Sequence, residues 1–90
     1  MSQAIVDPDE VRRFAQNLKQ FNTELRDRLA VLHGQLLNLG DSWRDQEHDK
    51  FAEEFAQTTR VIEAFVETAD QHIPFLLRKA ERIEEYLSQH

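Results

Sequence analysis

The chain has 90 residues, of which 40% are hydrophobic and 31% charged, and it contains no cysteine. This composition excludes a second folded domain, a disulfide framework and a disordered tail, and no apolar run is long enough to span a membrane. The net charge of -6 argues against nucleic acid and anionic membranes as partners, because both favour a basic surface. Residues 41–70 hold nine acidic and three basic side chains, which makes them either a solvated face or a surface for a basic partner.

The first helix is predicted over residues 8–39. Asp7 is suited to cap it, and Pro8 is pre-set for the first helical position. Gly34 is compatible with a close helix approach without requiring it, and Gly40 stands where a left-handed cap would end the helix. Apolar residues recur along this segment at steps of three and four and form one stripe: Val11, Phe14, Leu18, Phe21, Leu25, Leu29, Leu32, Leu36 and Leu39.

A turn over residues 40–45 and a second helix over 46–88 are predicted next. Asp41, Ser42 and Asp45 can each cap the second helix, and the pattern favours Asp45 or Ser42 without separating them. No segment alternates with the period of a strand. The second apolar stripe consists of Phe51, Phe55, Thr58, Ile62, Phe65, Ala69, Ile73, Leu76, Ala80, Ile83 and Leu87.

Pro74 interrupts the second helix, because a proline donates no backbone hydrogen bond and disfavours helical geometry in the residue before it. The sequence leaves two outcomes open: a continuous helix with a bend of more than about 20°, or a separate last helix from Phe75 onward. If the two helices are set level at the turn, the start of the first helix lies opposite residue 77 of the second helix. We therefore expect the last dozen residues to overhang, with Ala80, Ile83 and Leu87 uncovered.

Two antiparallel helices cannot cover apolar stripes of this width, so the predicted fold is all-α: one hairpin domain, residues 1–90, that dimerises into a four-helix bundle. The partner is either an identical chain or a related hairpin. Head-to-tail pairing would keep the acidic segments of two copies apart. The residues expected in the dimer or core interface are Phe14, Leu18, Phe21, Leu25, Phe51, Phe55, Ile62 and Phe65.

The turn carries the residues of a known family motif. The segment 39–45, with Trp43 inside it and Phe51 and Phe55 after it, resembles the WXG100 (ESAT-6-like) family of small helical hairpins exported by type VII secretion systems. The resemblance covers nearly the whole chain. Where the family has glycine two positions after tryptophan, this chain has Asp45, which points to a variant subfamily whose turn uses Asp45 as a helix cap.

The resemblance implies a secreted substrate, adaptor or carrier that has a type VII secretion ATPase among its partners. The first seven residues lack the features of a cleavable signal peptide, so export would follow another route. The family's signal, a tyrosine followed four positions later by an acidic residue, is approached by Tyr86 but meets His90. Tyr86 is therefore either part of an export signal or a packing residue, and Trp43 either covers the bundle end or docks a partner. The alternative function is a cytoplasmic structural or chaperone-like module.

No pattern of catalytic or metal-binding residues is present. The nitrogen ligands are His33, His48, His72 and His90, and none follows a glutamate at the spacing of a di-iron site. Adjacent residues on a helix point in different directions, so the triplet at 47–49 cannot converge on one ion. The acid pairs at 53–54 and 84–85 lie on polar faces and lack a buried cleft. We therefore expect no enzyme activity, no cofactor and no metal.

Overall fold

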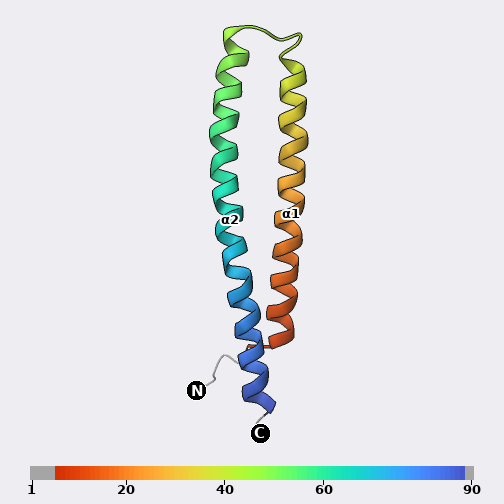
Figure 1. Cartoon of the computed structure of the whole chain (residues 1–90), viewed down its shortest axis with the longest axis vertical. Coiled ribbons are helices and arrows are strands. Elements are labelled where there is room, and N and C mark those ends of the chain that lie inside the picture. The colour runs from red at the N-terminus through yellow and green to blue at the C-terminus, as the bar shows by residue number, and fades with distance from the viewer. Residues whose placement is uncertain (1–5, 89–90) are drawn as a thin grey trace.

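The computed structural model describes residues 6–88 and consists of two long antiparallel helices (Figure 1). Helix α1 spans Pro8–Leu39 and helix α2 spans Gln46–Ser88. Within the described residues there are no strands, which confirms the predicted all-α hairpin. The molecule is a rod with extents of 68 × 23 × 18 Å. A rod two helices thick leaves much of each helix surface without a partner inside the chain.

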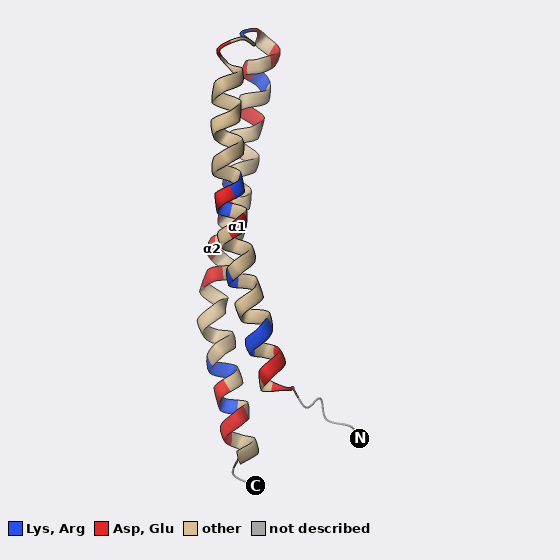
Figure 2. Ribbon diagram, turned by 90° about the vertical axis from the view of Figure 1, so that its right-hand side faces the viewer, with Lys and Arg blue, Asp and Glu red and all other residues tan. Residues whose placement is uncertain are grey.

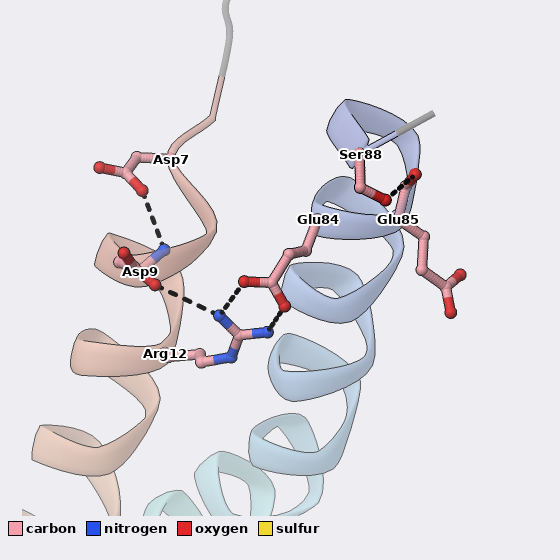
Figure 3. Close-up of polar contacts among 6 residues, drawn as sticks. All are labelled: Asp7, Asp9, Arg12, Glu84, Glu85 and Ser88. Atoms are coloured by element: carbon pink, nitrogen blue, oxygen red, sulfur yellow. Dashed lines mark hydrogen bonds and ion pairs between the residues drawn. The ribbon is translucent and has the colours of Figure 1, made fainter. Parts of the chain in front are cut away.

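The beginning of α1 follows the predicted capping pattern. An oxygen of the Asp7 carboxylate accepts a hydrogen bond from the Asp9 backbone N–H at 2.9 Å, and Pro8 occupies the first turn (Figure 3). Asp9 and Glu10 add negative charge at the positive end of the helix dipole. The local sequence therefore fixes where α1 starts without help from α2.

The left-handed cap expected at Gly40 is wrong. Gly40 has φ -62° and ψ -18°, which is ordinary right-handed helical geometry. The last turn of α1 instead tightens: the Gly40 N–H bonds to the carbonyl of Leu37 at 3.1 Å, and the Ser42 N–H bonds to that of Leu39 at 3.1 Å. These short-range bonds satisfy the terminal carbonyl groups, so no residue with positive φ is needed.

Of the caps that the sequence offered for α2, the structure selects Asp45. Its carboxylate accepts a hydrogen bond from the His48 backbone N–H at 2.9 Å, which is the usual contact between a capping residue and the third residue of a helix. Ser42 instead lies against α1, where its hydroxyl donates to the Leu39 carbonyl at 3.5 Å. A residue two positions after Trp43 thus starts the second helix in place of the family's glycine.

The core is a narrow seam between α1 and α2. The buried residues recur mostly every seven positions, the repeat expected where two helices coil around each other. Several of them are alanines, which let the helices approach closely. The buried side chains are Ala15, Asn22 and Leu36 from α1, and Val66, Ala69, Ile73 and Ala80 from α2.

Helix α2 continues through Pro74 without a break, so the alternative of a separate last helix from Phe75 is wrong. Ile73, directly before the proline, is buried in the seam. Packing against α1 holds the chain helical where the local sequence disfavours it. Figure 1 shows α2 leaning across α1 in its C-terminal half. The bend of more than about 20° stays a prediction.

Figure 1 shows α2 extending past the start of α1, but this overhang is shorter than the dozen residues expected. Arg12 near the start of α1 forms a two-pronged ion pair with Glu84, with nitrogen–oxygen distances of 2.6 and 3.1 Å (Figure 3). Ala80 is fully buried and Ile83 is partly buried. The reason lies at the turn, where the start of α2 extends beyond the end of α1 (Figure 1). Each residue of α1 therefore faces a residue of α2 that lies later in the sequence than expected for two helices set level at the turn. Leu87 is still 46% exposed.

Candidate functional site

Many large apolar side chains remain exposed outside the seam. Four phenylalanines of the two predicted stripes, Phe14, Phe21, Phe51 and Phe65, are between 47% and 58% exposed. A phenylalanine side chain contributes roughly 200 Å², so these four alone expose on the order of 400 Å². The prediction that two helices cannot cover this sequence is therefore confirmed for the isolated hairpin.

Part of this surface is a groove between the helices, with a volume of about 420 Å³. His72 is the one ionisable group in its lining, and the other side chains are apolar apart from one threonine. The full lining is Phe14, Leu18, Phe65, Thr68, Ala69, His72, Phe75 and Leu76. We call the surface formed by this groove together with Phe21 the apolar face, because Phe21 lies seven residues after Phe14 and so on the same side of α1.

The eight residues expected in the interface divide into two groups. Leu18, Leu25, Phe55 and Ile62 are partly buried at the margins of the seam, whereas the other four are the exposed phenylalanines described above. The sequence pattern merged two neighbouring columns of each helix into one stripe. The column of Phe14 and Phe21 on α1 and that of Phe51 and Phe65 on α2 lie outside the seam.

A polar cluster that the sequence reading missed lies in the seam. The amide Nδ2 of Asn22, which is 1% exposed, donates to Asp70 Oδ1 at 2.9 Å, and Arg26 pairs with Asp70 Oδ2 at 2.9 Å. The hydrogen bond from Asn22, followed by the contact with Arg26, lowers the pKa of Asp70 below its ordinary value. The burial of Asn22 could have been predicted from its spacing of seven residues from both Ala15 and Leu29. A buried amide of this kind favours one register of the two helices.

The turn forms a second aromatic surface. The rings of Trp43 and His48 meet edge to face with centroids 5.0 Å apart, and Trp43 lies 6.4 Å from Phe51. Phe51 in turn lies 6.2 Å from Phe55. Gly40, Trp43, His48 and Phe51 are named the turn cluster below. Trp43 is half-buried in it, so part of the indole remains accessible.

Charge is distributed unevenly along the rod. Residues 29–40 of α1 carry no charge, which leaves a long tan stretch next to the turn in Figure 2. The acidic side chains near the turn therefore have no basic counterpart on residues 29–40, and Arg26 pairs with Asp70 at the far end of the acidic segment. The turn half of the hairpin is acidic, whereas residues 1–20 and 71–90 each carry equal numbers of acidic and basic side chains.

The remaining sequence expectations concern the C-terminal end and metal binding. Tyr86 is 64% exposed on the last turns of α2, whereas His90 lies outside the described residues. Among residues 6–88, no three histidine or acidic side chains come together in a geometry that could hold a metal ion. Over the same range, no helix is both long and apolar enough to cross a membrane.

The hairpin with an aromatic turn matches a known family. The family model described as WXG100, proteins of 100 residues with WXG, matches residues 3–86. The chain belongs to the WXG100 family. This WXG100 protein has Asp45 at the position of the motif's glycine, and the cap at the start of α2 explains how the turn forms without that glycine.

Solved structures of the secreted protein EsxB from Bacillus anthracis str. Sterne have the same fold. A selenomethionine-labelled form matches with a TM-score of 0.77 and 23% identity over 96% of this chain and 98% of the EsxB chain. The wild-type form matches with a TM-score of 0.77 and 24% identity over 93% and 97%. At this identity the likeness supports the fold alone. No curated protein sequence is significantly similar to this WXG100 protein.

Proposed function

We propose that this WXG100 protein is a substrate, adaptor or carrier of a type VII secretion system that acts by protein–protein interaction and has no enzymatic role. The observation that carries the proposal is the open apolar face on a hairpin of this family. Membership of the family and the fold shared with a secreted protein support it. The alternative is a cytoplasmic structural or chaperone-like module with the same fold.

The apolar face is the proposed pairing surface, occupied by a second copy of this chain or by a related hairpin in a four-helix bundle. Phe14 and Phe65 line the groove at its centre, and both are more than half exposed in the isolated hairpin. Covering this face would remove several hundred Å² of apolar surface from water, which is a large gain for a chain with so small a core.

Head-to-tail pairing is favoured by the charge distribution. Two copies aligned head to head would place two acidic turn halves side by side, with no lysine or arginine in residues 29–40 of either copy to screen them. Aligned head to tail, each acidic half would lie beside the electrically balanced end of its partner. The same reasoning extends to a related hairpin, whose own open end would then be neutral or basic.

Tyr86 is the proposed contact for the secretion machinery, including a type VII ATPase. Its exposure near the end of α2, past most of the seam, supports a role in recognition. A partner that bears a complete signal is the preferred explanation for the His90 that stands in place of the acidic residue, because a histidine supplies no negative charge. Recognition of a different surface ranks second.

A secretion assay in the native host tests the proposal. The variants are Tyr86→Ala, Leu87→Ala as a control at the neighbouring exposed position, and a chain truncated after Glu85, which keeps the Arg12–Glu84 pair. We expect export of the wild type and of Leu87→Ala, and loss of export for the other two would show that this tail itself is recognised. Unchanged export of Tyr86→Ala would reject the role of Tyr86. Retention of the wild type in cells with an active secretion apparatus would instead favour the cytoplasmic alternative.

A further inference from the structure

His48 occupies an unusual position in the turn cluster. Its side chain is 16% exposed, and one edge of its ring lies under the backbone of Gly40. A Cβ placed on Gly40 would lie 3.6 Å from both Cε1 and Nε2 of the ring. The ring also packs edge to face with the ring of Trp43, and the two ring centroids lie 5.0 Å apart. The imidazole therefore fills the space between the end of α1 and the indole.

The two ring nitrogens of His48 have different surroundings. Nδ1 lies 3.5 Å from Asp49 Oδ1, and because a carboxylate only accepts hydrogen bonds, we assign the proton of the neutral ring to Nδ1. Nε2 is buried and has no hydrogen-bond partner among residues 6–88. In the neutral ring Nε2 therefore carries an unpaired acceptor lone pair in a buried position close to Gly40.

Protonation would change this contact. It would add an N–H group and a positive charge at Nε2, in a place where the structure offers no acceptor, and a buried unpaired charged donor is costly. The third position of a helix also disfavours a cation, because it lies at the positive end of the dipole. If the protonated ring rotates out into solvent, it avoids both of these energetic costs. Asp49 can still pair with it there.

The charged groups around His48 lie away from Nε2, and none of those in residues 6–88 accepts a hydrogen bond from it. Asp49 lies beside Nδ1 on the exposed side, and Asp45 is engaged by the His48 backbone N–H. From the turn, Arg44 donates from Nε to the Gly40 carbonyl at 3.2 Å and so holds a positive charge on the Gly40 side of the ring. The neighbouring part of α1, residues 29–40, contains no Asp, Glu, Lys or Arg, and His33 is its one titratable group.

We propose that His48 is a proton-operated latch of the WXG turn: the neutral ring holds Trp43 against the end of α1, and protonation at Nε2 releases the ring and exposes the indole. The latch lies within one hairpin and requires neither pairing nor export. It would make the family's signature tryptophan more accessible in mildly acidic surroundings than at neutral pH.

The fluorescence of Trp43, the one tryptophan in the chain, reads the latch directly. The full-length protein is brought from about pH 7.5 to about pH 5, a range in which free imidazole takes up its proton while most carboxylates stay ionised. In the wild type we expect the emission maximum to shift to the red and quenching by acrylamide to increase. Both readouts report exposure of the indole and not merely a change in its intensity.

Matched variants separate His48 from the other titrating groups. His48→Phe keeps a ring against Trp43 but cannot be protonated, so its emission should not respond to pH. His33→Gln and His72→Gln should respond as the wild type does. An unchanged wild-type emission, or an equal shift in His48→Phe, would overturn the proposal.

A measurement on the wild type tests the proposal even if a variant fails to fold. Nuclear magnetic resonance can follow the ring protons of His48 and the indole N–H of Trp43 in one titration. We expect the two signals to move together. Titration of His48 without movement of the Trp43 signal would also overturn the proposal.

Discussion

Phe65→Ala is the sharpest test of the apolar face. Phe65 is 54% exposed in the hairpin, which leaves about 110 Å² of a side chain of roughly 200 Å² for a partner to cover. At about 25 cal/mol per Å² this surface stabilises pairing by roughly 2.7 kcal/mol per chain. A symmetric dimer contains two such side chains, and alanine retains a small part of the contact. We therefore expect a loss of about 4 kcal/mol, or about a thousandfold weaker dimerisation.

Sedimentation equilibrium over a range of protein concentrations measures this change. Val31→Ala is the matched control, because Val31 is 60% exposed but lies at the seven-residue spacing of Glu24 and Asn38 on the polar side of α1. It should leave the dimer dissociation constant nearly unchanged. A monomeric wild type would refute pairing of identical chains, and equal effects of the two substitutions would refute the assignment of the face. Phe21→Asp and Phe65→Asp should go further and largely unfold the protein, because the isolated seam is small.

Three further predictions concern stability and are measured by thermal or denaturant unfolding. Asp45→Ala should cost about 1 kcal/mol by removing the cap of α2, whereas Ser42→Ala should cost little; the reverse order would contradict the assigned cap. Gly34→Ala should stabilise the protein by up to about 1 kcal/mol, because nothing lies within 4 Å of the added Cβ, and destabilisation would show that a partner covers this site. Hydrogen bonds from Asn22 and Arg12 hold the pKa values of Asp70 and Glu84 below their ordinary values of 3.8 and 4.5, so these carboxylates stabilise the fold above those values and lose that effect as the pH falls below them. The double variant Asp70→Asn, Glu84→Gln should therefore lose less stability than the wild type on acidification through this range, and equal losses would contradict the role of the two pairs.

The functional elements were predictable from sequence to different degrees. Trp43 could be identified, and the cap of α2 could be narrowed to Asp45 or Ser42, because a turn motif and a helix cap depend on neighbouring residues in the chain. The pairing of Asn22 with Asp70 could not, because the two residues are 48 positions apart and their meeting depends on the register of the helices. The position of His48 under Gly40 was likewise invisible, since it depends on the path of the chain between α1 and α2.

By itself the sequence determined two helices, the cap at the start of the first helix and an excess of apolar side chains over what one hairpin can bury. These features follow from local capping chemistry and from a repeat of three and four residues. The tertiary structure decided which column of each stripe lies inside, how far α2 extends along α1, and that Pro74 is absorbed without a break. The physical reason is that periodicity defines a stripe but not the rotation of the helix about its axis. Close packing of Ala15, Ala69 and Ala80 sets that rotation, and it leaves Phe14, Phe21 and Phe65 outside the seam.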